Sequence, residues 1–378
     1  IIGSILGSIG NETIVRLTQT FSSIFSSLLG FIIPLMILGF VTKGISDLTQ
    51  GAGKLLGFTT ALSYISTLIA GSIAYLVAIN FFPLFISSDS FEAILGNSVS
   101  VEPFFTIPLA PIIDVISALV FAFMMGICIS SMRGKEIQDY MYNIFTEFAA
   151  IITKVLNKLI IPLIPFYVMS IFANLAFTGS AWSILNVLWK VFLTVIILHL
   201  IYLLILFTIS GLISKKNPFT MLKNQISGYL TAIGTQSSAA TIPINLSCAE
   251  KNGVSKEIRE FVVPLCASIH MAGSMITITC CVTSVLLISN IPINFQTILT
   301  FILTLGVAMV ASPGAPGGGV MTALPFLPLV GIASEGELAS LLITLYLTQD
   351  SFGTACNVSG DNAIAVIVDT FYKKFIKK

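Results

Sequence analysis

Apolar runs long enough to cross a lipid bilayer recur along almost the whole of this chain. About 20 residues suffice for one helical span, and the runs occupy residues 14–41, 54–86, 104–131, 141–178, 183–213, 257–289 and 338–372. Only 9% of the residues are charged, whereas soluble chains carry about a quarter. The sequence therefore predicts an all-α, polytopic membrane protein. Because several runs exceed one span, we expect tilted or kinked helices, with kinks at Pro34, Pro108, Pro111, Pro162 and Pro165.

Composition also limits the partners and cofactors. The formal net charge is +1, which argues against a nucleic-acid partner. The six cysteines show no zinc or haem spacing and lie in apolar sequence, so they are predicted to be small packing residues. We predict no cofactor, and we predict membrane lipid as the surroundings.

A polar stripe near the C-terminus is the strongest indication of function. Asp350, Thr354, Asn357 and Asp361 lie in apolar sequence, and on a helix the last three fall within about 40° of Asp350. A charge at the bilayer centre costs at least a few kcal/mol, so such residues usually line an ion or substrate path. A capped helix end with a satisfied polar interface is the structural alternative.

Lys and Arg residues predict how the chain crosses the membrane. Connections rich in these residues face the cytoplasm. Basic and non-basic connections alternate here if the C-terminal tail, which ends in Lys377 and Lys378, is cytoplasmic. The alternation holds only if 217–248 and 292–333 each return to the side from which they start. The pattern predicts two re-entrant hairpins in a multi-pass protein of the cell membrane.

Both expected hairpins carry tips suited to ligand binding. The first tip is TQSSAATIP at Thr235–Pro243, and the second is SPGAPGGG at Ser312–Gly319. Non-helical backbone at membrane depth is tolerated where it is buried or lines a cavity, and helix N-termini favour carboxylates. Paired interrupted segments of this kind indicate the binding site of a secondary transporter. A tight packing motif and an exposed linker remain the respective alternatives.

Further motifs extend the pattern: GVSKEI at Gly253–Ile258, PLCASIHMAGS at Pro264–Ser274 and NVSGD at Asn357–Asp361. Together with the two tips, they resemble the dicarboxylate/amino acid:cation symporter family. The resemblance implies an elevator-type transporter with inverted repeats that forms a homotrimer. It implies scaffold helices in residues 1–53 and a transport-domain helix in 54–86. Residues 87–213 would be mainly scaffold with part of the transport domain, and 214–378 would form the transport-domain core.

The resemblance also implies a substrate site. Asp350 matches the aspartate that holds the substrate α-ammonium, and Asn357 matches the asparagine that meets its α-carboxylate. Backbone of the two hairpin tips would cradle that carboxylate, and the second hairpin would be the extracellular gate. The implied substrate-binding residues are Ser237, Ser238, Ser274, Ala315, Asp350, Gly353, Thr354 and Asn357.

Two sodium sites follow from the same resemblance. Asp361, with carbonyl groups of Cys266, His270 and Asn357, matches one site, and carbonyl groups near Ser268 and Ser312 match a second site. A deep third cation site is weakened: Ser66 and Thr67 retain its hydroxyl pair, but Ala272 replaces its aspartate and His270 its asparagine. We therefore expect at most two sodium ions per substrate, with a proton on the titratable His270 as an alternative to the third.

Gly353 is the departure that bears on the substrate. Acidic amino acid transporters of the family place an arginine three residues after the ammonium-binding aspartate, and this chain has Gly353 there. Without a guanidinium, a side-chain carboxylate loses its bidentate partner. The sequence predicts cation-coupled symport of a small neutral amino acid, with an acidic amino acid or a dicarboxylate as the alternative.

Two other classes of protein remain as rivals. An intramembrane serine hydrolase would need a base near Ser237 or Ser238, and a channel would show flux without saturation. Two further ionisable residues receive structural predictions. Asp114 is expected to make a scaffold contact, and His199, on an apolar run, is expected to be a buried packing residue.

Overall fold

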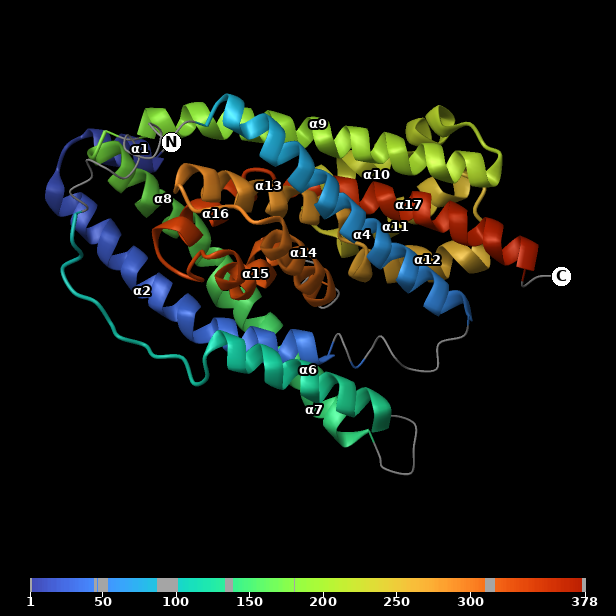
Figure 1. Cartoon of the computed structure of the whole chain (residues 1–378), viewed down its shortest axis with the longest axis horizontal. Helices are drawn as coiled ribbons and strands as arrows, with labels where there is room; N and C mark the ends of the chain where they lie inside the picture. The colour runs from blue at the N-terminus through green and yellow to red at the C-terminus, as the bar shows by residue number, and fades with distance from the viewer. Residues whose placement is uncertain are drawn as a thin grey trace.

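The computed structural model describes residues 2–43, 46, 54–86, 101–132, 139–179, 181–309 and 317–375. These residues form helices joined by turns and short irregular segments, and they contain no strand. The prediction of an all-α protein is confirmed. Figure 1 shows the helices lying roughly along one long axis, with the C-terminus at one end.

The N-terminal part of the chain supplies one group of helices. They are α1 (Ile2–Ser8), α2 (Glu12–Met36), α6 (Val115–Met132), α7 (Tyr140–Val155) and α8 (Ile161–Phe177). Helix α1 packs on α8 through Gly7, where an added Cβ would lie only 2.8 Å from the Cβ of Ala176. Helix α2 also lies against α8, so these helices pack mainly with one another.

Prolines lie next to a π-helical turn in two places among these helices. In α2, Pro34 is followed by a π-helical turn, η1 (Ile37–Val41), where the Ile37 N–H is shared between the carbonyl groups of Ile33 and Pro34. A second π turn, η4 (Leu156–Ile160), precedes Pro162 and Pro165, and the axis bends by 44° there. The kink predicted at Pro162 and Pro165 is confirmed, because a proline removes a helical hydrogen bond, whereas Glu12–Val41 continues past Pro34 as one span.

The other two expected kinks lie outside any helix. Residues 101–114, which include Pro108 and Pro111, are irregular, so the helix expected over 104–131 begins only at Val115. Asp114 precedes that helix, and its Oδ1 accepts the Ser117 N–H at 2.9 Å. An N-cap carboxylate of this kind satisfies a backbone donor that the first helical turn leaves open.

The second group of helices surrounds α13 (Ala272–Ile288) and α17 (Asp350–Phe375). Every residue of α13 except Leu287 is buried, as expected for a helix that is apolar on all sides. Helix α4 (Lys54–Phe81) packs on α13, and α9 (Ala181–Ser214) packs on α17 and α13. The remaining members are α12 (Lys256–Ile269) and α16 (Glu337–Leu347).

Two helical hairpins pack against this core, as the charge pattern predicted. Hairpin 1 consists of α10 (Pro218–Thr235) and α11 (Ser238–Lys251), and it turns at Gln236, whose φ of 51° is left-handed. Hairpin 2 consists of α14 (Phe295–Met309), α15 (Gly318–Ala323) and the 3₁₀ helix η5 (Leu324–Val330). Residues 310–316 of its tip lie outside the described residues.

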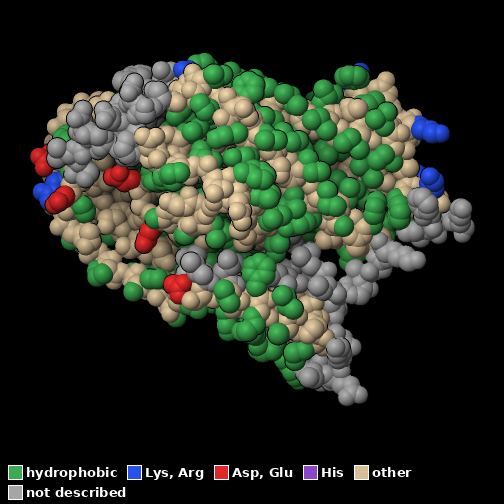
Figure 2. Space-filling model, viewed as in Figure 1, with side chains coloured by type: hydrophobic (Ala, Val, Ile, Leu, Met, Phe, Trp, Pro, Cys, Tyr) green, Lys and Arg blue, Asp and Glu red, His purple; other side chains and the backbone are tan. Residues whose placement is uncertain are grey.

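Several helices have the length and apolar character of membrane spans. Among the described residues these are Glu12–Val41, Leu55–Leu84, Leu188–Ser214 and Lys256–Ile288, and the bent pair Tyr140–Ile160 with Pro165–Asn174 adds a fifth if it forms one span. Figure 2 shows hydrophobic side chains along the middle of the molecule, basic side chains at the end where the chain finishes, and acidic side chains together with basic ones toward the opposite end.

Candidate functional site

Two helix breaks create the centre of the site. Helix α12 ends at Ile269 and α13 begins at Ala272, with extended backbone at His270. Helix α16 ends at Leu347, and α17 begins at Asp350 after a turn. Backbone groups left open at such breaks can be satisfied by side chains or by ligands.

Asn357 closes the first break by capping α13. Its Oδ1 accepts the N–H groups of Gly273 at 2.7 Å and Ser274 at 3.3 Å, and its Nδ2 donates to Ser274 Oγ at 2.9 Å. Asn357 is 2% exposed. The amide therefore holds α17 against the start of α13 and brings two predicted substrate-binding residues together.

Asp350 lies at the second break, where hairpin 2 reaches it. Its Oδ2 accepts the backbone N–H of Gly317 at 2.6 Å, and the Tyr346 hydroxyl lies beside its carboxylate. That hydroxyl also lies beside Ser274. The carboxylate is 4% exposed, so a buried anion is held by neutral donors. Such a group suits a cationic ligand, which supplies the missing opposite charge.

Gly353 lies against α13 in the described structure. An added Cβ would stand 3.2 Å from Thr277 Oγ1 and 3.6 Å from the backbone of Gly273. The glycine thus permits close packing of α17 on α13. Thr354, one residue further, is buried.

Asp361 and His270 form a buried pair where sodium ligands were expected. His270 Nδ1 lies 3.0 Å from Asp361 Oδ1, and the second carboxylate oxygen, Oδ2, has no hydrogen-bond partner among the described residues. Both side chains are almost completely buried. One anionic oxygen therefore remains available to a cation, which fits the charge compensation that a dehydrated sodium ion requires.

Protein groups bond one another where the weakened third cation site is expected. His270 Nε2 lies 2.9 Å from Ser66 Oγ, which also contacts the Tyr202 hydroxyl at 2.8 Å. Thr67 Oγ1 accepts the Met271 N–H at 3.2 Å and donates to a backbone carbonyl. Ala272, fully buried, adds no ligand. The imidazole therefore bonds the groups that would otherwise face a cation.

The remaining predicted residues lie around this centre. Ser237 caps α11 by accepting the Ala240 N–H at 3.3 Å, and Ser238 is buried at the start of the same helix. Ser268 is exposed in the last turn of α12, and the Cys266 carbonyl accepts the His270 N–H at 2.8 Å. Ala315 and Ser312 lie outside the described residues.

Sequence reasoning missed two sets of polar residues. Tyr346 precedes Asp350 by four residues, so it shares the polar stripe at helical spacing, but an aromatic residue in apolar sequence gave no polar signal. Gln225, Asn245 and Asn362 form a buried amide cluster between hairpin 1 and α17. Two of these amides lie in segments expected as a hairpin, and nothing in their spacing indicates that they meet.

Other expectations concerned packing residues. His199 is fully buried, and its Nε2 lies 3.0 Å from the Gly273 carbonyl oxygen and 3.1 Å from Thr277 Oγ1, which confirms a buried packing histidine. All six cysteines are free thiols, and five are buried as expected, whereas Cys128 is exposed.

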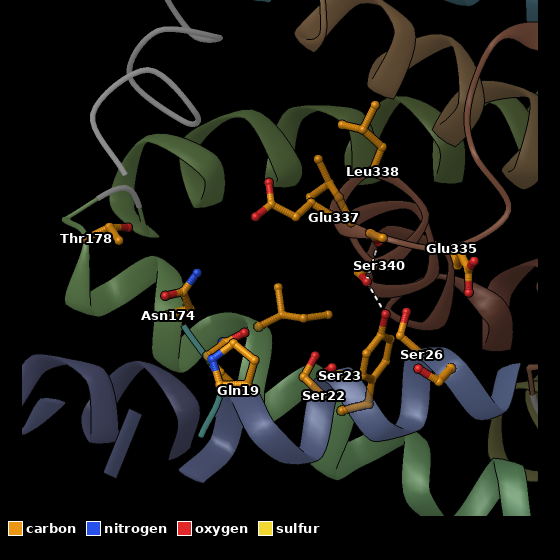
Figure 3. Close-up of a pocket in the computed structure, with 16 residues that line it drawn as sticks. Gln19, Ser22, Ser23, Ser26, Asn174, Thr178, Glu335, Glu337, Leu338 and Ser340 are labelled. Carbon is orange, nitrogen blue, oxygen red and sulfur yellow. Dashed lines mark hydrogen bonds between the residues drawn. The ribbon is translucent and has the colours of Figure 1, made fainter. Parts of the chain in front are cut away.

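A cavity of about 480 Å³ lies apart from these residues. As Figure 3 shows, Ser22, Ser23 and Ser26 of α2 line one side, and Glu337 and Leu338 line the opposite side. The Tyr167 hydroxyl of α8 hydrogen-bonds Ser340 of α16 at its edge. The cavity therefore separates the N-terminal helices from the segment that leads into the site.

Buried carboxylates and amides at helix breaks, approached by two helical hairpins within an apolar bundle, define the architecture of a secondary transporter. A family model for the sodium:dicarboxylate symporter family matches residues 1–371. The chain belongs to this family, whose members share an elevator-type transporter fold.

Individual relatives are excitatory amino acid transporters. The protein of that name from Caenorhabditis elegans is 28% identical over 271 residues, which are 69% of this chain and 51% of the relative. Excitatory amino acid transporter 1 of Rattus norvegicus is 32% identical over 184 residues (48% and 32%), and excitatory amino acid transporter 3 of Homo sapiens is 28% identical over 272 residues (70% and 50%). The chain thus spans about half the length of these relatives or less. The family and the relatives are transporters, not enzymes, which excludes the hydrolase alternative.

Proposed function

We propose that this protein carries out sodium-coupled symport of a small neutral amino acid across the cell membrane. Asp350 would bind the substrate α-ammonium, because it is a buried anion with only neutral donors around it. Ser274, Asn357 and the backbone of the hairpin tips would meet the α-carboxylate. Thr354 would line the same stripe.

The absence of basic residues supports a neutral substrate. No Lys or Arg occurs between Arg259 and Lys373, a stretch that includes α13, hairpin 2 and most of α17. The relatives are named for excitatory amino acids, and the family for dicarboxylates. A second carboxylate on the substrate would need a cation here, and burial without one costs several kcal/mol. This is the observation on which the substrate class depends.

Sodium is the proposed coupling ion. The unpaired Asp361 Oδ2 would bind one ion, with the carbonyl groups of Cys266, His270 and Asn357, and the region of Ser268 and Ser312 would bind a second. His270 would take the place of the third by bonding Ser66 and Asp361. We therefore propose two sodium ions per substrate.

Movement of the site would follow an elevator mechanism. Residues 1–53 and most of 87–213 would form the scaffold, and 54–86 with 214–378 would form the transport domain. Packing supports this division, because α2, α1 and α8 contact one another, while α4 and α9 each contact both α13 and α17. The cavity of Figure 3 lies between the two groups. We also propose that the protein forms a homotrimer. The C-terminus would be cytoplasmic, as the basic residues at that end favour.

Counterflow in liposomes tests the proposal. Liposomes that contain the purified protein are loaded with each of a panel of unlabelled amino acids. Entry of the same labelled amino acid is then followed while the sodium and pH gradients are varied separately. We expect exchange of L-alanine or L-serine that depends on the sodium gradient, and weak competition by L-aspartate. Exchange of L-aspartate at low concentration would establish the acidic alternative. Uptake driven by the pH gradient alone, and lost in His270→Gln, would assign a proton to His270 in place of sodium.

A further inference from the structure

Tyr346 lies where hairpin 2, α13 and α17 meet, although no sequence motif points to it. Its side chain is 1% exposed, and its hydroxyl lies beside both Ser274 and Asp350, within reach of hydrogen bonds to them. Gly319 of hairpin 2 faces the same hydroxyl, and an added Cβ there would overlap it and lie 3.0 Å from the Tyr346 Cζ atom. A single oxygen atom is thus in contact with the gate, the helix start and the carboxylate.

The donors and acceptors around this oxygen allow hydrogen bonds in one direction only. Asn357 Nδ2 can only donate, and it donates to Ser274 Oγ at 2.9 Å. Ser274 can then donate its single proton to Tyr346. An ionised carboxylate accepts only, so the Tyr346 hydroxyl, which lies beside it, would donate to Asp350. The series runs from the amide to the carboxylate, and Tyr346 joins the two ends of the proposed substrate site.

We infer that Tyr346 is a positioning residue that makes the site selective for α-amino acids over their 2-hydroxy analogues. By holding Asp350 in one orientation, it directs the carboxylate toward the substrate ammonium, which a hydroxyl group replaces poorly because it carries no charge. By holding Ser274, it fixes the other end of the site. This inference rests on the proposed role of Asp350 but not on the substrate being neutral.

The test compares Tyr346→Phe with wild type and with Tyr167→Phe. Tyr167 is the matched control, because it is also a buried tyrosine whose hydroxyl bonds a serine, Ser340, but it lies at the cavity edge. Inhibition of uptake is measured for three pairs of compounds: L-alanine and L-lactate, L-serine and L-glycerate, and L-aspartate and L-malate. Thermal unfolding in detergent checks that each variant folds.

We expect Tyr346→Phe to weaken binding of the transported amino acid about tenfold, the effect of one hydrogen bond to a charged group. Binding of the hydroxy acid should change little, so discrimination falls by a similar factor, and Tyr167→Phe should leave it unchanged. Unaltered discrimination in Tyr346→Phe would overturn the inference. It would also be overturned if the variant bound both compounds of a pair equally less well and had a lower melting temperature. If wild type binds only L-aspartate and L-malate, the proposal of a neutral substrate is wrong. The ratio of L-aspartate binding to L-malate binding then still tests the role of Tyr346.

A second variant tests the contact with hairpin 2. Gly319→Ala should impair uptake, because its methyl group overlaps the Tyr346 hydroxyl. The double variant Gly319→Ala with Tyr346→Phe should lose less than the product of the two single losses, because the overlapping oxygen is gone. Independent effects of the two substitutions would show that the tyrosine does not contact the closed gate.

Discussion

The two hairpins are attached to α17 by different kinds of bond. In hairpin 1, Asn245 Oδ1 accepts from Gln225 at 2.8 Å and from Asn362 at 2.7 Å, and Asn245 Nδ2 donates to the Val358 carbonyl at 2.9 Å. Hairpin 2 reaches the start of α17 through the Gly317 N–H on Asp350, at 2.6 Å. Hairpin 1 is thus fixed by side chains that bond only protein, whereas hairpin 2 bonds a carboxylate that is proposed to bind substrate.

This difference indicates which hairpin responds to ligand. A substrate ammonium at Asp350 changes the acceptor that hairpin 2 uses, but it leaves the amide cluster of hairpin 1 untouched. We therefore propose that hairpin 1 acts as a fixed wall of the site and hairpin 2 as its gate. The motifs of the two tips do not distinguish a wall from a gate, because each tip is rich in small residues.

The largest effect is expected when the shared carboxylate is neutralised. Asp350→Asn should abolish most uptake, because losing a buried, hydrogen-bonded charge partner costs about 2–5 kcal/mol. The protein should still fold, since the amide can accept the Gly317 N–H. Uptake and thermal unfolding are measured together, with Asp114→Asn as a control at a helix cap far along the chain. Wild-type uptake by a folded Asp350→Asn protein would contradict the assignment.

The attachment of hairpin 1 can be broken separately. Asn245→Ala should lower the free energy of unfolding by about 1–3 kcal/mol, because Gln225 and Asn362 lose a buried partner. Thermal unfolding in detergent measures the loss. Asn224→Ala is the matched control, since Asn224 lies on the same hairpin and makes more exposed hydrogen bonds. Equal melting temperatures for the two variants would mean that the cluster does not fix hairpin 1.

The packing beneath the gate gives a third comparison. Gly353→Arg should destabilise the protein by about 1–3 kcal/mol, because the side chain must start 3.2 Å from Thr277 Oγ1 in a close helix contact. We expect no gain of L-aspartate uptake from this single change. A stable variant that takes up L-aspartate would show that the site has room for a guanidinium and that Gly353 alone sets the specificity.

The smallest expected effect is the different response of the two hairpins to bound ligand. Hydrogen–deuterium exchange is measured with and without sodium and L-alanine or L-serine. Amides of residues 295–309 and 317–333 should exchange several-fold more slowly with both ligands, because local opening of the gate is suppressed. Amides of 218–251 should change little. Equal protection of both hairpins would refute the distinction between wall and gate.

The fold could be predicted from the sequence more completely than the contacts within the site. Apolar runs and basic connections sufficed for the helices and for both hairpins, because these features repeat over many residues. Single contacts were harder: Tyr346 meets Ser274 only because the breaks at 270–271 and 348–349 face each other. The same holds for the amides of Asn245 and Asn362, which lie more than a hundred residues apart. Polar residues could be assigned to a helix stripe, but their partners depend on packing that no spacing encodes.

The imidazole of His270 has an energetic consequence for an ion-coupled transporter. A side chain that occupies an ion's place cannot be released with the cargo, so it contributes nothing to uphill accumulation. Moving one elementary charge through 100 mV is worth about 2.3 kcal/mol, so each sodium ion not carried lowers the attainable concentration ratio about fiftyfold at that voltage. If His270 replaces an ion through its contacts with Ser66 and Asp361, as proposed, the transporter would reach a shallower gradient and use fewer ions for each molecule it moves.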